Sequence, residues 1–196
     1  MKVLILGGQG NLGTQLTQSG PSWGHDIISW DRDDLDLSDW PLAQVKLNSL
    51  SHVEAVINTV AYNAVDAAET EPGRTMADIL NHQLVANLAQ WCRERGLTLI
   101  HYSSDYVFAG DKPEGYKEDD EPHPINEYGR SKRAGEVSLM VEEEQGLNYY
   151  LIRTSKLFGP RGLSPSAKPS FFDIMLQLAA TCSELKGVDA EFSCFT

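Results

Sequence analysis

Residues 1–13 have the sequence MKVLILGGQGNLG, in which a short apolar run leads directly into regularly spaced glycines. The run Val3–Leu6 predicts a buried strand, and a helical pattern follows the glycines. Between strand and helix, Gly7, Gly10 and Gly13 match the pattern G-x-x-G-x-x-G. Such glycines allow a tight turn, a close approach of the backbone to a pyrophosphate, and close packing of helix on strand. The stretch therefore predicts a dinucleotide-binding turn, and a purely structural strand–helix turn is the alternative.

A second expected strand, Asp26–Trp30, is followed immediately by Asp31. An acidic residue about 20 residues beyond such glycines typically binds the adenosine ribose hydroxyls of a dinucleotide. Arg32 is suited to a 2′-phosphate, which Asp31 would repel. The expected cofactor is therefore NADPH or NADH, and the sequence leaves the choice between them open.

Short apolar runs alternate with longer helical patterns along the rest of the chain. Because nearly all these runs lack polar alternation, they predict a parallel sheet with helices on both faces, an α/β fold of the doubly wound Rossmann type. The expected strands are Val3–Leu6, Asp26–Trp30, Val53–Val60, Leu97–Ser103 and Tyr149–Arg153, and the expected helices span 11–19, 39–49, 74–95, 127–144 and 171–185. Residues 110–124 are expected to form a long polar loop and residues 159–170 a flexible one, while 188–192 (VDAEF) is a candidate for one more strand.

The composition limits the classes of function. A chain of 196 residues, 41% of them hydrophobic, suits one sizeable core. The formal net charge of -12 argues against nucleic acid or an anionic membrane surface as a partner. Cys92, Cys182 and Cys194 are widely spaced and odd in number, so neither a metal site nor a disulfide framework is expected. No apolar stretch approaches the ~18 residues of a membrane span, and a cytoplasmic location is expected.

Residues 127–136, EYGRSKRAGE, place Tyr128 and Lys132 one helical turn apart. A free phenol has a pKa near ~10 and is a slow acid–base catalyst at neutral pH. A lysine on the same helix face is expected to lower the pKa of this phenol by stabilising phenolate, and to hold a nicotinamide ribose. Ser104, at the end of the fourth expected strand, is a candidate for fixing a substrate oxygen, because ligands bind at the carboxyl ends of such strands. An exposed helix face and a turn serine are the alternatives.

Five segments occur in the order GGQGNLG, NTVAYNAVDAAE, SSDYVFAG, GYKEDDEPHPINEYGRSKRAGE and RTSKLFGP. In this order they resemble the extended short-chain dehydrogenase/reductases, and within them the dTDP-4-dehydrorhamnose reductases. The resemblance spans residues 1 to about 160 and is most specific around Tyr128, at Tyr116, Glu118, Pro124, Asn126, Ser131, Gly135 and Glu136. Related dehydratases tend to have an Asp-Glu pair where this chain has Asp105-Tyr106, which favours the reductases.

The resemblance implies a catalytic set of Ser104, Tyr128 and Lys132. In such a set, Tyr128 protonates the C4 carbonyl oxygen of a nucleotide-linked 4-keto-6-deoxy sugar, Ser104 holds that oxygen, and Lys132 tunes Tyr128 and binds the ribose. The expected cofactor contacts are Gly7, Gly10, Asn11, Leu12, Gly13, Asp31, Arg32, Asp36, Leu37, Val60, Ala61, Tyr62, Tyr128 and Lys132. The expected substrate contacts are Asn63, Val65, Ser104, Asp105, Tyr106 and Tyr128. For Val65 and Tyr106, simple packing is an equal alternative.

Three features depart from the family. Lys156 stands where the family often has tryptophan, Asn63 stands where threonine is usual, and the resemblance weakens beyond about residue 160. We expect residues 1–160 to form an NAD(P)-binding Rossmann domain and residues 161–196 to begin a shortened substrate lobe.

The short chain is accordingly expected to bind the cofactor and to turn over a nucleotide-sugar substrate only weakly. It is also expected to form a homo-oligomer or to bind a partner through the apolar face of the helix 171–185. Two alternative functions remain open from the sequence. One is a non-catalytic cofactor-binding regulatory subunit, like that of methionine adenosyltransferase, and the other is a nucleotide-sugar epimerase or dehydratase.

Overall fold

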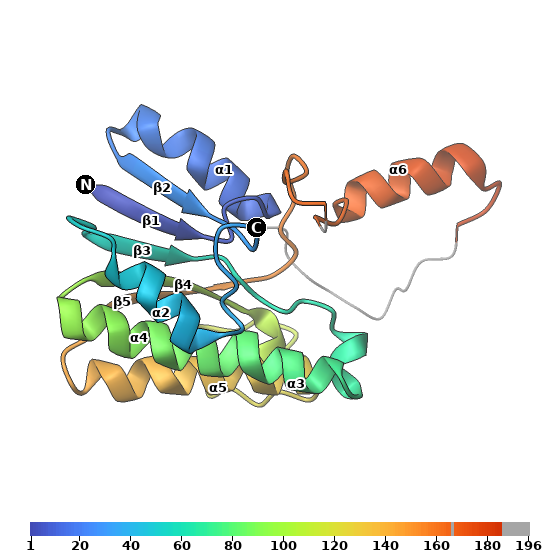
Figure 1. Ribbon diagram of the computed structural model, residues 1–196. Helices are drawn as coiled ribbons and strands as arrows, with labels where there is room; N and C mark the ends of the chain where they lie inside the picture. The colour runs from blue at the N-terminus through green and yellow to red at the C-terminus, as the bar shows by residue number, and fades with distance from the viewer. Residues whose placement is uncertain (166, 186–196) are drawn as a thin grey trace.

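The computed structural model describes residues 1–165 and 167–185. Five parallel strands form one sheet in the order β2-β1-β3-β4-β5 (Figure 1). The strands are β1 (Lys2–Leu6), β2 (Asp26–Trp30), β3 (Ala55–Asn58), β4 (Thr98–Ser104) and β5 (Asn148–Thr154). The parallel Rossmann-type sheet predicted from the alternating pattern is confirmed. The candidate strand at 188–192 lies outside the described residues.

The helices are divided unequally between the two faces of the sheet (Figure 1). The chain moves from β1 to β2 in one direction and from β2 through β5 in the other, so right-handed crossovers place α1 on one face and the helices that follow on the opposite face. The helices are α1 (Asn11–Ser19), α2 (Trp40–Asn48), α3 (Gly73–Asp78), α4 (Leu84–Arg95), α5 (Glu127–Glu143) and α6 (Phe171–Thr181). The long helix expected at 74–95 is continuous in direction but contains a π-helical segment, Ile79–Gln83, between α3 and α4.

Most of the core lies between the sheet and the helices α2, α4 and α5. Leu4 and Leu6 of β1 pack there with Leu88 of α4 and Leu139 of α5, all fully buried. On the opposite face, α1 covers a smaller cluster centred on Ile5. Because all the strands are parallel, their carboxyl ends lie at one edge of the sheet. The reversal of strand order between β1 and β3 leaves a crevice at this edge, where ligands bind in this class of fold.

The last described strand, β5, differs from the expected fully buried strand. Its residues alternate between exposed and partly buried, and Tyr150 is 62% exposed. Among the described residues, β5 pairs only with β4 and so forms an edge of the sheet. Tyr149 and Leu151 pack against the main core, so the alternate residues Tyr150 and Ile152 lie on the opposite face, where the cluster under α1 includes no residue of β5 in the part of the chain that the structure describes. The alternation follows from position in the sheet and not from the composition of the strand.

Helix α6 extends away from the sheet (Figure 1). It begins with a capping box, in which Ser170 and Asp173 exchange side-chain-to-backbone hydrogen bonds, and it contains no buried residue. Of the apolar face that we expected on this helix, Phe171, Phe172, Ile174 and Leu178 are exposed, and Met175 is partly buried. Leu176 is exposed as well. Among the described helices, none has the length and apolarity needed to cross a membrane.

The packing of α2 on the sheet can be tested with two leucines of one helix. Leu47 is fully buried and Leu42 is 64% exposed. We expect Leu47→Ala to lower the free energy of unfolding by about 2–5 kcal/mol, because it removes buried methyl groups and leaves a cavity. Leu42→Ala should change it by about 0.5 kcal/mol or less. Denaturant unfolding would measure both values, and equal effects would contradict the packing described here.

Candidate active site

The glycine turn between β1 and α1 is built by backbone contacts that exclude side chains. Gly7 has a φ of 80°, in the left-handed region that favours glycine, and its amide donates to the carbonyl oxygen of Trp30. A Cβ atom on Gly13 would collide with the carbonyl oxygen of Gly7. A Cβ atom on Gly10 would lie 3.3 Å from that same oxygen and, apart from its own chain neighbours and helix, near no other atom of the described residues within 4 Å. Gly13 therefore permits close packing of α1. Gly10 leaves space on the side where a Cβ would point, although Gly162 packs against its carbonyl carbon.

Asp31, at the end of β2, lies directly beside the glycine turn. Its carboxylate accepts hydrogen bonds from the backbone amides of Gln9 and Arg32, both at 2.8 Å. The carboxylate is thereby fixed beside the turn, in the groove at the carboxyl end of β2. The neighbouring Asp36 instead accepts hydrogen bonds from the hydroxyl and the amide of Ser38, which lower the pKa of its carboxyl.

The three residues expected to be catalytic lie together on two adjacent elements. Asn126 caps α5 by accepting a hydrogen bond from the amide of Gly129, so that the helix presents Tyr128 and Lys132 in its first two turns. Ser104, the last residue of β4, lies near the phenol of Tyr128 and acts to lower its pKa. Tyr128 is 9% exposed and Lys132 is 2% exposed. The arrangement places a hydroxyl, a phenol and an ammonium group in one site with little solvent exposure.

The structure corrects our expectation for the pKa of Tyr128. Burial raises the pKa of this phenol, and Ser104 only partly opposes the rise. The ammonium of Lys132 does not donate to the phenol but to the backbone carbonyl oxygen of Tyr102, at 2.6 Å. Burial also lowers the pKa of Lys132 to about 8, against the opposing effect of the Glu136 carboxylate. At neutral pH Tyr128 is therefore protonated, and Lys132 is mostly charged.

One groove of about 660 Å³ connects the glycine turn to the site around Tyr128. It runs along the carboxyl ends of β1, β2, β3 and β4. The residues singled out in the sequence that line this groove are Gly7, Gly10, Asn11, Leu12, Gly13, Asp31, Arg32, Asp36, Leu37, Val60, Ala61, Asn63, Ser104, Tyr128 and Lys132. These residues come from five separate stretches of the chain, and the fold brings them to a single surface.

Four other residues singled out in the sequence do not line the groove: Tyr62, Val65, Asp105 and Tyr106. Tyr62 and Val65 pack with Tyr128 in a small apolar cluster, which favours the packing alternative for Val65. The ring of Tyr106 meets the ring of Tyr128 edge-to-face, with 5.5 Å between centroids, and stays 40% exposed. Asp105 accepts a hydrogen bond from the Ser104 hydroxyl at 3.1 Å. Tyr106 and Asp105 thus contact the site without forming the groove wall.

A segment missed by the sequence reasoning crosses the glycine turn. We call residues 161–165 and 167–168 the strap. The amide of Ser164 donates to the carbonyl oxygen of Gln9 at 2.8 Å, and the amide of Gly162 donates to the Asn11 side chain at 2.9 Å. Although we expected a flexible loop here, the strap is hydrogen bonded to the turn and lines the groove with Ser164 and Lys168. The partners of one bond lie 151 residues apart, so no local pattern predicts the contact.

Asn81 is a second residue that the sequence reasoning missed. It is fully buried in the π-helical segment, and its side-chain amide exchanges two hydrogen bonds of 2.9 Å with the backbone of Tyr62. It also donates to the Ser131 hydroxyl at 3.0 Å. Asn81 thereby holds the chain after β3 against α5. An asparagine on the buried side of an apolar helix was the available signal.

The sheet order, the glycine turn after β1 and the groove at the reversal of strand order define a dinucleotide-binding α/β class of protein. Among the described residues, no group of histidine, cysteine and acidic side chains is arranged to hold a metal ion. A comparison with protein families matches residues 1–196 to the family described as RmlD substrate binding domain. The chain belongs to this family.

Individual relatives agree with this assignment. A dTDP-4-dehydrorhamnose reductase of Burkholderia thailandensis is 34% identical over 98% of this chain and 60% of its own length. The crystal structure of a dTDP-4-dehydrorhamnose reductase from Bacillus anthracis in complex with NADP is 35% identical, with a TM-score of 0.80 over 91% of this chain and 59% of that one. A UDP-glucose 4-epimerase of Thermus thermophilus, at 24% identity and a TM-score of 0.74, shares the fold. The chain spans about three fifths of the length of these relatives.

The contact between strap and glycine turn gives a prediction. A side chain at Gly162 would collide with the backbone of Gln9, Gly10 and Asn11, so Gly162→Val should detach the strap. We expect trypsin to cleave after Arg161 several-fold faster in this variant, because a released segment is a better substrate. The neighbouring Leu163 is exposed, and Leu163→Val should leave the cleavage rate unchanged. Equal rates in wild type and Gly162→Val, followed by mass spectrometry, would contradict the contact.

Proposed function

We propose that the chain is the cofactor-binding and catalytic part of an NAD(P)H-dependent reductase that acts on a nucleotide-linked 4-keto-6-deoxy sugar. The observation that carries this proposal is the convergence of Ser104, Tyr128 and Lys132 at one end of a groove whose other end is the glycine turn. The names of the relatives, dTDP-4-dehydrorhamnose reductases, support the same reaction. In this proposal residues 1–160 form the NAD(P)-binding domain, and residues 161–196 belong to the substrate lobe.

The groove suits a dinucleotide along its whole length. The amino end of α1 and the open backbone at Gly10 would receive the pyrophosphate, because helix N-termini attract anions. The Asp31 carboxylate is positioned for the hydroxyls of an adenosine ribose. NADPH or NADH would supply the hydride for the substrate carbonyl carbon. The bound NADP of the Bacillus anthracis relative supports this cofactor class.

The chain's own residues supply the proton and the orientation. Burial raises the pKa of Tyr128, so the phenol stays protonated at neutral pH and is ready to protonate the carbonyl oxygen. The hydroxyl of Ser104, which lies near that phenol and lines the same groove, would hold the same oxygen. The ammonium of Lys132 would hold the ribose next to the nicotinamide and stabilise negative charge on Tyr128 after the proton leaves.

The convergence of Ser104, Tyr128 and Lys132 at one site favours an enzyme over a non-catalytic regulatory subunit. A binding subunit has no need for the contact between Ser104 and Tyr128, nor for a nearly fully buried lysine beside them. Asn63 lines the groove near this end and would contact the sugar. We predict a cytoplasmic location. We also predict that a second copy of the chain, or a partner, covers the exposed face of α6.

The open position at Gly10 gives the first test. We expect Gly10→Val to weaken binding of NADH and NADPH at least tenfold, because the added methyl groups would occupy the space for the pyrophosphate. Its thermal stability should stay close to that of the wild type. Gly13→Ala is the contrasting variant, since its added atom collides with the Gly7 carbonyl and should lower the melting temperature. Calorimetric titration of both nucleotides that shows no binding to folded wild-type chain would contradict the proposal.

Removal of the phenol hydroxyl gives the second test. With dTDP-4-dehydrorhamnose as substrate, Tyr128→Phe should lower kcat by roughly 10²–10⁴, because the reaction loses its general acid. The affinity for NADPH should stay within about twofold, since the ring and its packing remain. Tyr150→Phe, at an exposed position of β5, is the matched control and should retain full turnover. Unaltered turnover in Tyr128→Phe would exclude the proposed proton donor.

A further inference from the structure

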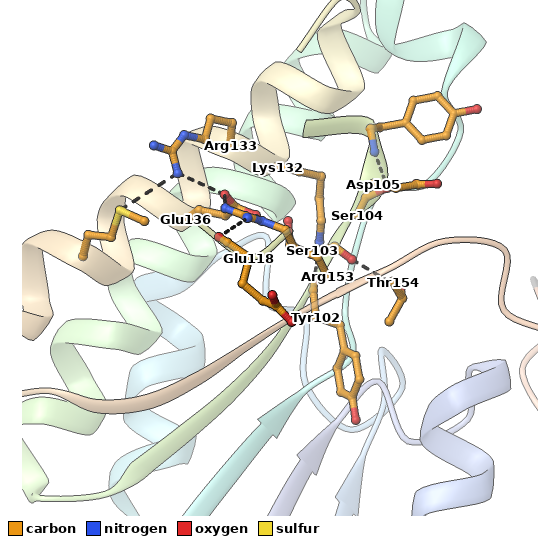
Figure 2. A network of polar contacts seen from close by, with 12 residues as sticks. Tyr102, Ser103, Ser104, Asp105, Glu118, Lys132, Arg133, Glu136, Arg153 and Thr154 are labelled. Carbon is orange, nitrogen blue, oxygen red and sulfur yellow. Dashed lines mark hydrogen bonds and ion pairs between the residues drawn. The ribbon is translucent and has the colours of Figure 1, made fainter. Parts of the chain in front are cut away.

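A buried carboxylate lies one helical turn beyond the proposed catalytic lysine. The side chain of Glu136 is fully buried on α5. One of its oxygens accepts from Nε of Arg153 at 2.9 Å, and the other accepts from Nη2 of Arg153 at 2.9 Å and from Arg133 at 3.0 Å (Figure 2). Although burial opposes ionisation, the hydrogen bonds from Arg153 hold the pKa of Glu136 below its ordinary value. A full negative charge is therefore fixed inside the protein.

Arg153 connects this carboxylate to β5 and to the loop that follows β4. It lies on β5, immediately before Thr154, which lines the groove. Its guanidinium also donates to the backbone carbonyl oxygen of Glu118 at 3.1 Å (Figure 2) and lies over the ring of Phe108, 5.0 Å from the centroid. The pair Glu136–Arg153 thus joins α5, β5 and the loop that follows β4 at one point.

Lys132 lies between this pair and the groove. Its ammonium donates to the Tyr102 carbonyl oxygen of β4 (Figure 2). His101 of β4 also lies near Lys132. Burial of the His101 ring and the charge of Lys132 lower the pKa of His101 well below its ordinary value, so the ring is neutral. On the same helix, Glu136 lies four residues further along and is buried like Lys132. Its carboxylate raises the pKa of Lys132 against the effect of burial. The charge that supports this ammonium therefore comes from the next turn of α5.

We infer that Glu136 is a positioning residue for Lys132, and that Arg153 sets how strongly its charge acts on the lysine. The inference rests on the proposed function, in which the Lys132 ammonium holds the ribose. A buried ammonium is costly without a nearby negative charge. Were the carboxylate absent, the guanidinium groups of Arg153 and Arg133 would face the lysine uncompensated. Lys132 would then lose its proton at a lower pH and no longer be available as a cation.

The two partners have opposite effects on Lys132, which separates an electrostatic role from a structural one. Glu136→Gln removes negative charge and should lower the pKa of Lys132. Arg153→Met frees the carboxylate from its main partner and should raise it. Both variants weaken the contact between residue 136 and residue 153, although Arg153→Met also loses the bond to Glu118 and Glu136→Gln also weakens the bond from Arg133. A purely structural role would therefore weaken binding of the cofactor in both variants, with no movement of the pH profile.

The experiment is a fluorescence titration of the 196-residue chain with NADH between pH 6 and pH 10. In the wild type, affinity should fall as the pH rises through the pKa of Lys132, about 8. A downward shift of one pH unit in Glu136→Gln makes binding about fivefold weaker than wild type at pH 8 and nearly equal at pH 6. In Arg153→Met the fall should move to higher pH. Arg130→Gln, on the exposed face of α5, should leave the profile in place.

Two further variants keep the test decisive. Lys132→Met should abolish the decrease in NADH affinity at high pH. If the decrease persists in this variant, the inference is overturned. If Glu136→Gln does not fold, Arg153→Met and the double variant Glu136→Gln/Arg153→Met carry the test. The net charge facing the lysine is the same in the double variant as in the wild type, so its profile should lie near the wild-type one.

The outcomes separate this inference from the proposed function. Wild-type chain that binds no NADH at any pH contradicts the proposed function itself. Wild-type binding with a profile that is unmoved in both single variants, or that moves in the same direction in both, overturns only the role of Glu136.

Discussion

The site depends on the cost of burying one ammonium group. Lys132 is 2% exposed and reaches the groove through the interior, where an uncompensated cation is strongly unfavourable. The structure meets this cost with a backbone carbonyl oxygen from β4 and a carboxylate one turn along α5. That carboxylate in turn requires Arg153 from β5. These contacts join β4, α5 and β5, the elements that carry Ser104, Tyr128 and Arg153.

The other end of the groove is governed by sterics instead of charge. The close approach of α1 to the turn requires a hydrogen atom in place of a side chain at Gly13, and the same turn leaves Gly10 open. Asp31 fixes the turn through the amide of Gln9 and marks the far end of the crevice. Because both ends lie at the carboxyl edge of one parallel sheet, a single extended ligand reaches both. The proposed reductase function follows from this geometry together with the family.

Local patterns in the sequence were sufficient for most of the fold. The glycine spacing and the apolar runs predicted β1 and α1, and the predicted helix 127–144 agrees closely with α5 at Glu127–Glu143. These features depend on residues that are near one another in the chain. The convergence of the groove residues followed once the strands were known to be parallel, since their carboxyl ends meet at one edge.

Other features depend on contacts between distant segments and were not predictable in this way. The rise in the pKa of Tyr128 comes from burial, which a Tyr–Lys spacing does not reveal. The strap meets the glycine turn through backbone amides, which carry no residue signature. The alternating exposure of β5 reflects its place at the edge of the described sheet. In each case tertiary packing, and not local propensity, decides the outcome.

The most direct test of the account is a crystal structure of the chain grown with NADPH or NADH. The account predicts that the pyrophosphate lies against the backbone at Gly10, that the adenosine ribose lies at Asp31, and that the nicotinamide ribose contacts Lys132 beside Tyr128. A dinucleotide bound outside this groove, or bound in it with the nicotinamide far from Tyr128, would contradict the account.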